Sequence, residues 1–304
     1  MTTALYTHAD CLSHETPSGH PEQVARLHAI ERALADVQGL DRREAPLCVD
    51  DDILLCHPQA YLERIAAHGR GALDADTWMS EGSMQAARRA VGGAVAAVDA
   101  VLAGDVANAF VATRPPGHHA ETETPMGFCL FGNVSIAAKH ALERHGLARV
   151  AVVDFDVHHG NGTQDLLWNE PRALFVTSQQ MPLWPGTGDE SETGAHDNVL
   201  NLPLAPESGG EEMRAVYESK VFPRVAAFAP ELILVSAGFD AHAEDPLANL
   251  NWTDDDFAWL TDRLCALASE QCGGRLVSVL EGGYDLDALG RGVKRHVEGL
   301  MAAG

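Results

Sequence analysis

The stretch RVAVVDFDVHHGNGTQD, residues 149–165, indicates the fold of this chain more clearly than any other segment. Residues 149–155 form a nearly continuous apolar run, which is typical of a strand covered on both faces in a parallel sheet. Polar Asp, His, Gly and Asn residues follow at the point where the strand must end. Ligands of open α/β sheets bind at the carboxyl ends of the strands, so the stretch predicts both a buried strand and a site beside it.

Four further segments repeat this arrangement of an apolar run followed by residues rich in His, Asp or Gly. The runs are residues 108–113, 173–178, 232–236 and 275–280, and the segments that follow them are RPPGHHA, QQMPLWPGTG, AGFDAH and EGGYD. Because the carboxyl ends of parallel strands meet at one edge of a sheet, we expect these distant segments to form a single site.

Helical patterns separate the predicted strands. They cover residues 21–37, 83–102, 133–144, 211–228, 253–269 and 286–300. Strands that alternate with helices predict an α/β fold in which helices cover both faces of one parallel sheet. No repeat or low-complexity linker divides the sequence, so we expect a single domain over residues 1–304.

The composition is ordinary for a soluble globular protein, with 46% hydrophobic and 21% charged residues. Lys and Arg total 21 against 44 Asp and Glu, and the formal charge of −23 predicts no binding to nucleic acid. This charge favours cationic ligands weakly, although a genomic bias against lysine or adaptation to salt also explains it. No apolar run of about 18 residues predicts a membrane span. No secretory signal is visible, so we expect the six cysteines to be reduced thiols in a cytoplasmic protein.

Asp156 and His158 are candidate metal ligands. Residues two apart at a strand end point to the same side, and Asp240 at the end of another predicted strand supplies a third ligand. Two carboxylates and one imidazole suit zinc or ferrous iron, with a position left for water. Taken alone, the Asp-Val-His motif is more typical of a core histidine bonded to a turn, and the second aspartate makes the metal interpretation equally good.

His118 and His119 are candidate proton-transfer groups, because adjacent histidines rarely share one metal and imidazoles exchange protons near neutral pH. A pair of surface histidines in a loop explains this motif equally well. Tyr284 follows two glycines that let the backbone pass close to a ligand, so its hydroxyl could face a developing oxyanion. By itself, that motif is more typical of an ordinary turn with a packing tyrosine.

Together these motifs resemble the histone deacetylase superfamily of zinc amidohydrolases. The similar segments are residues 114–138, 152–165, 185–188, 234–247 and 280–285, in the order of the family and over most of the chain. Their details resemble the class II branch and its bacterial relatives, which include acetylpolyamine amidohydrolases. The resemblance implies the arginase-deacetylase fold, with a central and mainly parallel sheet of about eight strands.

The resemblance also implies a role for each matching position. The zinc ligands would be Asp156, His158 and Asp240, and the catalytic groups His118, His119, Tyr284, Asp154 and Asn161. Asp154 would orient His118, and Asn161 would be the partner of His119, which we expect to be less basic than in class I members because these carry Asp there. The substrate would contact Gly127, Phe128, Trp184, Leu247 and Gly282, and a structural potassium ion would lie at Asp154 and Ser178.

The reaction implied is metal-assisted hydrolysis of the amide of an acyl-lysine side chain in a peptide or protein. Acetylpolyamines and other small acetylated amines are the alternative substrates, although Leu247 stands where polyamine-selective relatives carry an acidic residue. Glu244 and Asp245 would tolerate a cation. The chain has no long insertion of the kind through which polyamine relatives dimerise, so we expect an open entrance, and the oligomeric state stays undecided.

Two other classes of function are less favoured by the residues. A dimanganese ureohydrolase of the arginase type needs further carboxylates around a second metal, and residues 159–161 are His-Gly-Asn where such ligands are expected. A non-catalytic binding module would typically have lost the tyrosine, a histidine or a metal ligand, and all of these are present.

Overall fold

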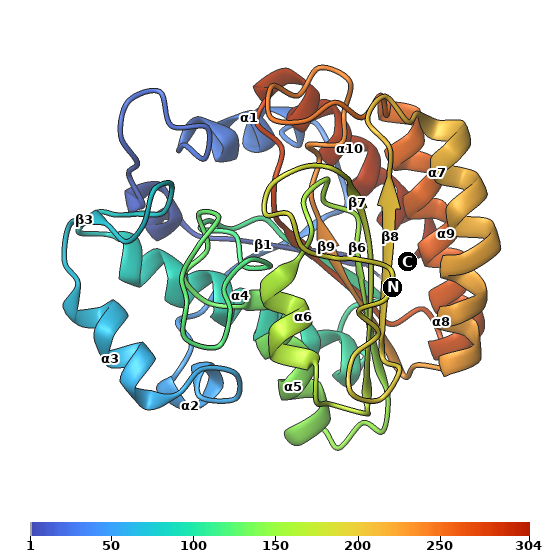
Figure 1. Ribbon diagram of the computed structural model, residues 1–304, viewed down its shortest axis with the longest axis horizontal. Coiled ribbons are helices and arrows are strands. Elements are labelled where there is room, and N and C mark those ends of the chain that lie inside the picture. The colour runs from blue at the N-terminus through green and yellow to red at the C-terminus, as the bar shows by residue number, and fades with distance from the viewer. Residues whose placement is uncertain (1) are drawn as a thin grey trace.

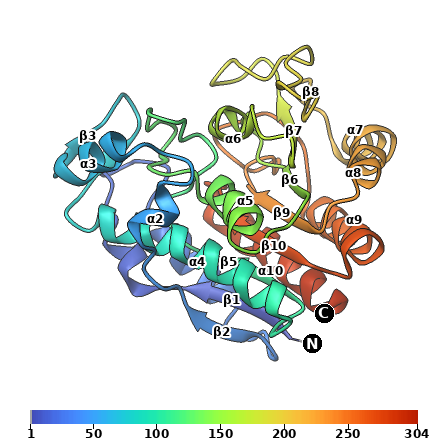
Figure 2. The same ribbon diagram turned by 90° about the horizontal axis from the view of Figure 1, so that it is seen from below.

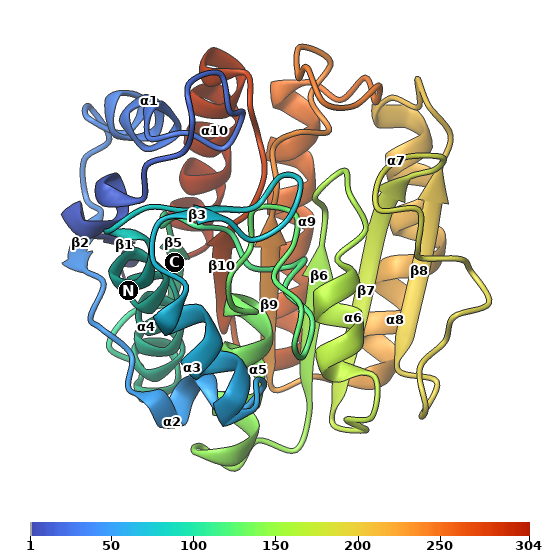
Figure 3. The same ribbon diagram turned by 60° about the vertical axis from the view of Figure 1, so that its left-hand side comes forward.

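The computed structural model describes residues 2–304 and has an eight-stranded parallel sheet at its centre (Figure 1). The strand order is β2-β1-β5-β10-β9-β6-β7-β8, as Figure 3 shows from left to right. The strands are β1 (Thr3–Thr7), β2 (Asp41–Glu44), β5 (Asn108–Val111), β6 (Val150–Asp154), β7 (Ala173–Gln180), β8 (Val199–Leu204), β9 (Leu232–Ala237) and β10 (Leu276–Leu280). A small antiparallel hairpin of β3 (Gly71–Ala72) and β4 (Trp78–Met79) lies apart from this sheet.

Helices cover both faces of the sheet (Figure 2). One face carries α1 (Ala25–Ala33), α7 (Gly210–Val216), α8 (Phe222–Phe228), α9 (Asp254–Cys272) and α10 (Leu286–Ala303). The other face carries α4 (Ser83–Ala103), α5 (Asn133–Glu143) and α6 (Asn161–Leu167), with α2 (Asp50–Ile53) and α3 (Gln59–Ala67) packed outside them. A 3-10 turn spans Ala9–Ser13, and a π-helical turn, Tyr217–Val221, joins α7 to α8. None of the helices within residues 2–304 is long and apolar enough to cross a bilayer.

Strand β6 illustrates why the apolar runs form buried strands. Ala151 and Val153 pack in the core under α9 and α10, whereas Val150 and Val152 pack in the core under α4 and α5. Side chains alternate between the two faces of a strand, so a strand between two helical layers must be apolar at every position. The predicted α/β fold is confirmed, and all five predicted strands are present.

The sequence prediction missed strands β1, β2 and β8 of this sheet, as well as the short strands β3 and β4 of the hairpin. Strand β2 lies at the edge of the sheet and reads DRRE, with alternating half-buried and exposed residues, so it lacks the apolar signal of a central strand. The predicted helix over residues 21–37 was too long, since α1 begins at Ala25. The segment before it passes into the core, where the Glu22 carboxylate is fully buried between the guanidinium groups of Arg26 and Arg114.

The topology places a crevice beside β6. Strands β6 and β9 are neighbours, but the chain continues from β6 towards β7 and from β9 towards β10, in opposite directions along the sheet. The connections therefore diverge at the carboxyl ends of these two strands, which is where ligands bind in open α/β sheets. Asp154, the last residue of β6, pairs with Ser236 of β9 and brings the two polar segments side by side.

Candidate active site

Asp156, His158 and Asp240 come together at this crevice. His158 Nδ1 lies 3.1 Å from Asp156 Oδ1 and 3.1 Å from Asp240 Oδ2, and all three side chains are buried. Two ligand atoms on one tetrahedral zinc ion, each with a bond of about 2.0–2.1 Å, are about 3.3 Å apart. The spacing and the donor set of two carboxylates and an imidazole therefore fit a single ion with a further position for water.

Backbone N–H groups hold these carboxylates in place. Asp156 Oδ1 accepts from His158 N at 2.9 Å, Asp156 Oδ2 from Gly282 N at 2.8 Å, and Asp240 Oδ1 from Val157 N at 3.0 Å. A Cβ atom on Gly282 would lie 2.1 Å from Asp240 Oδ2. The structure thus places Gly282 behind the candidate metal ligands, whereas the sequence assigned it to the substrate.

The electrostatics of the cluster favour a cation. Burial disfavours a charged imidazole, but hydrogen bonds to the carboxylates of Asp156 and Asp240 outweigh it and raise the pKa of His158 to about 10. The carboxylates therefore stabilise positive charge at the position of the His158 proton. Metal binding requires neutral imidazole and displaces this proton, so a divalent cation would take over its electrostatic role.

His118 and His119 lie beside the cluster, with their ring centroids 3.9 Å apart. Both are buried, which disfavours their charged forms. For His118, the negative charges of Asp156 and Asp154 outweigh burial and hold its pKa well above the usual value. For His119, burial and the positive charges of His118 and His158 hold its pKa well below the usual value. Two imidazoles with opposite shifts are suited to different proton-transfer roles.

Hydrogen bonds fix the tautomer of each ring. His118 Nδ1 lies 2.9 Å from Asp154 Oδ2, and because a carboxylate only accepts, His118 Nδ1 carries a proton. His119 Nδ1 lies 2.8 Å from Asn161 Oδ1. The amide nitrogen of Asn161 donates to Glu121 Oε1 at 2.8 Å, so its oxygen must face His119. His119 Nδ1 is therefore the donor, and its Nε2 is left with a free lone pair.

Glu121 and Glu281 are two functional candidates that sequence reasoning did not assign, although both lie within the similar segments. Glu281 is fully buried, and its Oε2 accepts from the backbone N–H groups of Gly117 and His118 at 2.7 and 3.1 Å. Its Oε1 accepts from the Ser236 hydroxyl at 3.1 Å. Burial raises the pKa of Glu281 to about 7. Through these hydrogen bonds, the Glu281 carboxyl group connects the loop that carries His118 and His119 to strands β9 and β10.

A cavity of about 200 Å³ leads to these groups. Its lining residues are Asp76, His119, Gly127, Phe128, His158, Leu183, Trp184, Leu247 and Tyr284. The Phe128 ring meets the Tyr284 ring edge-on at 5.8 Å, and the Trp184 ring meets His119 edge-on at 4.7 Å. Four of the five predicted substrate positions therefore line it, and Gly282 does not.

Gly127 allows these walls to approach each other. Its φ is +55°, and a Cβ atom there would lie 2.4 Å from His119 Cδ2 and 2.6 Å from the Trp184 ring. Any larger residue would push these rings apart. Asp76 and Leu183 were missed by the sequence analysis, because Asp76 lies in the β3–β4 hairpin and Leu183 in the loop after β7, without a distinctive motif.

Tyr284 is held from two sides. The Arg26 guanidinium lies 5.0 Å from the centre of its ring, and its backbone N–H donates to Asp245 Oδ2 at 2.7 Å. Asp245 is buried and also accepts from the backbone of Leu247, so it anchors loops and is not exposed to an incoming cation. Glu244 lies 2.9 Å from Arg291. Both carboxylates, which by the sequence would tolerate a cationic substrate, thus already have partners within the protein.

Asp154 is the last residue of β6, and Ser178 lies near the end of the neighbouring strand β7. Asp154 uses one oxygen for His118 and the other for the backbone N–H of Asp156 at 3.0 Å. Ser178 Oγ lies 2.8 Å from the Tyr217 hydroxyl. The potassium site expected at these residues stays a prediction.

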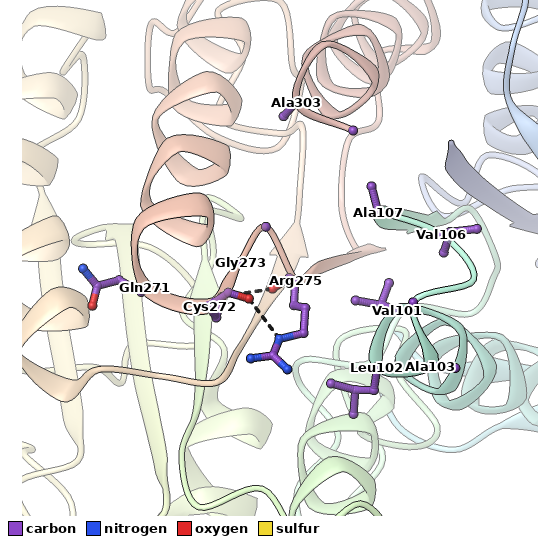
Figure 4. Close-up of a pocket in the computed structure, with 13 residues that line it drawn as sticks. Val101, Leu102, Ala103, Val106, Ala107, Gln271, Cys272, Gly273, Arg275 and Ala303 are labelled. Atoms are coloured by element: carbon purple, nitrogen blue, oxygen red, sulfur yellow. Dashed lines mark hydrogen bonds between the residues drawn. The ribbon is translucent and has the colours of Figure 1, made fainter. Parts of the chain in front are cut away.

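A larger cavity, of about 620 Å³, lies at the opposite edge of the sheet (Figure 4). It is bounded by the carboxyl ends of α4 and α9 and by the end of α10. Arg275 is its charged side chain, and Arg275 Nε donates to the carbonyl oxygen of Cys272 at 2.9 Å. The described residues that line it include no His, Asp or Glu, whereas His119 and His158 line the smaller cavity.

Comparison with known proteins agrees with this geometry. A family model described as the histone deacetylase domain matches residues 20–300. The chain belongs to the histone deacetylase family. A histone deacetylase-like amidohydrolase of Pseudomonas aeruginosa is 42% identical, over 88% of this chain and 73% of its own length. Histone deacetylase 14, chloroplastic, of Arabidopsis thaliana is 40% identical, over 98% of this chain and 76% of its own length.

The fold is likewise that of the histone deacetylase family. A solved structure described as the crystal structure of the HDA15 HD domain superposes with a TM-score of 0.93. It is 29% identical and covers 99% of this chain and 89% of its own. The arginase-deacetylase type of fold expected from the resemblance is therefore confirmed.

Proposed function

We propose that this protein is a zinc-dependent deacetylase that hydrolyses the acyl amide of acyl-lysine side chains. The observation that carries the proposal is the convergence of Asp156, His158 and Asp240 beside two histidines of opposite pKa shift, at the base of an aromatic cavity. The names of the relatives, which are deacetylases and amidohydrolases, support the same reaction class.

Zinc held by Asp156, His158 and Asp240 would lower the pKa of a water molecule to about 7 and polarise the substrate carbonyl. His119 accepts the proton of the attacking water on its Nε2 atom. Its low pKa keeps the ring neutral, and Asn161 keeps the ring proton on Nδ1, so Nε2 is free to act as the base. Tyr284 donates its hydroxyl hydrogen bond to the carbonyl oxygen as negative charge develops there. The leaving amine then takes a proton from His119 or from His118.

The walls of the cavity account for binding. Phe128 and Trp184 would pack against the methylene groups of the lysine arm, and Gly127 lets the chain pass between their rings. Trp184 is 41% exposed and marks the entrance. A neutral, apolar arm that ends in an amide fits this lining, and an acyl group would lie near the metal ligands.

An acetylpolyamine or another small acetylated amine is the second candidate substrate. Asp76 is a half-buried carboxylate in the lining, where it would meet the distal ammonium group of such a substrate. Leu247, also in the lining, offers no charge. The ratio of kcat/KM for an acetyl-lysine peptide to that for N-acetylputrescine decides between the two, and a zinc-loaded protein that hydrolyses neither would refute the deacetylase proposal.

Further features of the proposal rest on the family resemblance for the potassium ion, and on the sequence itself for the domain, the location and the absence of nucleic-acid binding. We propose a structural potassium ion at Asp154 and Ser178, a single deacetylase domain over residues 1–304 and a cytoplasmic protein that binds no nucleic acid. Ferrous iron is the alternative metal, because the same ligands hold it. Two plant relatives are named chloroplastic.

A further inference from the structure

A second group of potential metal ligands lies far from the active site. His140 Nε2 and His145 Nε2 lie 2.7 and 2.6 Å from the same oxygen, Oδ1 of Asp99. Asp99 comes from α4, His140 from the last turn of α5, and His145 from the loop that follows α5. One potential ligand atom from each residue lies within 4.8 Å of the others.

This cluster lies at the amino edge of the sheet. Helix α4 leads into the beginning of β5, and α5 leads into the beginning of β6, whereas the catalytic residues follow the ends of these strands. Helices α4 and α5 pack side by side (Figure 2). The cluster therefore joins two helices that carry none of the metal-binding or proton-transfer residues described above.

The surroundings favour a cation over an isolated carboxylate. Asp99 lies near the carboxyl end of α4, and His140 and His145 lie at the carboxyl end of α5. The partial negative charge at a helix carboxyl end opposes an aspartate there and favours a positive ion. The net charge of −23 adds to this preference.

We propose that Asp99, His140 and His145 form a second metal site for a zinc-class divalent ion, which clamps α4 to α5. Two imidazoles and one carboxylate are a zinc donor set, and water would complete a tetrahedron. Around such an ion each Nε2···Oδ1 separation becomes about 3.3 Å, which requires an increase of about 0.6 Å for His140 and about 0.7 Å for His145. The Asp99 and His145 side chains are 51% and 31% exposed, so both are free to rotate by this amount.

His140 provides the rigid part of the site. Its side chain is largely buried, and within residues 2–304 its Nδ1 has no hydrogen-bond partner. In this structure Nε2 carries the imidazole proton, because its partner Asp99 only accepts. A metal ion that binds Nε2 would displace this proton and leave the remaining one on Nδ1. The competing interpretation is that both histidines only donate N–H bonds to Asp99, and this interpretation requires no ion.

Metal counting on the zinc-loaded holoenzyme separates these interpretations. After dialysis against buffered free zinc, the wild type should hold a second zinc ion per chain, and His145→Ala and Asp99→Asn should lack it. His68→Ala, which removes an exposed histidine outside the cluster, should match the wild type. Added zinc beyond the first equivalent should raise the Tm of the wild type and of His68→Ala but not of His145→Ala.

Equal zinc content in the wild type, His145→Ala and Asp99→Asn would overturn the proposal, and so would a Tm that responds to zinc equally in all of them. Both readouts are independent of turnover, so they stand whether or not the protein proves to be a deacetylase. Retention of the first zinc ion in His145→Ala shows that the variant has folded with its catalytic site intact.

Discussion

Replacing Asn161 with aspartate in a Glu121→Gln background should move the acid limb of the pH profile of kcat/KM to higher pH. The substitution places a carboxylate where the Asn161 amide oxygen now lies 2.8 Å from His119 Nδ1. Two opposite charges about 4 Å apart interact by about 4 kcal/mol at an effective dielectric constant near 20, which is an upper bound of about 3 pKa units. Carboxylates beside ionisable groups typically shift them by about 1–3 units.

The sign follows from the role of His119 as the base. Its low pKa keeps it neutral and active down to acidic pH in the wild type, because burial and the neighbouring charges of His118 and His158 disfavour its proton. A raised pKa leaves His119 protonated over a wider range, so activity should be lost at low pH first. The assay is kcat/KM for an acetyl-lysine peptide from pH 5 to 9, a range of about two units either side of neutrality.

The Glu121→Gln background is needed because Glu121 Oε1 accepts from the Asn161 amide nitrogen at 2.8 Å. In the single variant, two carboxylates would face each other and one would be protonated. Glu121→Gln alone is the matched control, and its acid limb should stay near that of the wild type. An unmoved acid limb in a folded, zinc-loaded double variant would mean that His119 is not the base.

Three further predictions concern the oxyanion, the ligand support and the core. Tyr284→Phe should keep its zinc and lose about 10²–10³ in kcat; near-normal turnover would exclude the tyrosine from the reaction. Gly282→Ala should lose catalytic zinc by elemental analysis, because its Cβ would lie 2.1 Å from Asp240 Oδ2, whereas Gly290→Ala, whose Cβ would meet its neighbours at 3.4 Å, should retain it. Burial lowers the pKa of His296 from 6.5 to about 3, so the folded state resists its protonation. Its contribution to stability is full above pH 6.5 and falls by about 1.4 kcal/mol per pH unit below that value until the folded pKa is reached. Urea unfolding should show a flatter acid slope for His296→Asn than for the wild type, and equal slopes would contradict this.

The helices and strands that sequence reasoning found share strong local signals. Strands β6, β9 and β10 are continuous apolar runs, and α9 and α10 begin within a residue of the positions expected. Strand β2 was missed because it is an edge strand of polar residues and lacks a continuous apolar run. The beginning of α1 was misplaced because the segment before it is held in the core by the ion pair of Glu22 with Arg114, a residue far away in the sequence.

The residues of the candidate site likewise include some that the sequence could reveal and others that it could not. Asp156, His158 and Asp240 could be chosen from the sequence, because each follows an apolar strand and carries a metal-binding group. Glu121 could not, since its effect on His119 passes through the Asn161 amide. The position of Gly282 behind the carboxylates of Asp156 and Asp240 likewise depends on how the loop after β10 crosses the ends of β6 and β9.

What the sequence alone determined is the group of buried strands with continuous apolar runs, the order of the motifs and the chemical identity of the candidate ligands, because these depend on local hydrophobicity and on residue type. What only the tertiary structure decided is the protonation behaviour of individual side chains and which of them lie close together. The opposite pKa shifts of His118 and His119, the loop-anchoring role of Asp245 and the meeting of Asp99 with His140 and His145 depend on side chains that packing brings together from distant segments. The burial of an individual polar side chain and the electrostatic field of its neighbours carry no signature in the order of the residues.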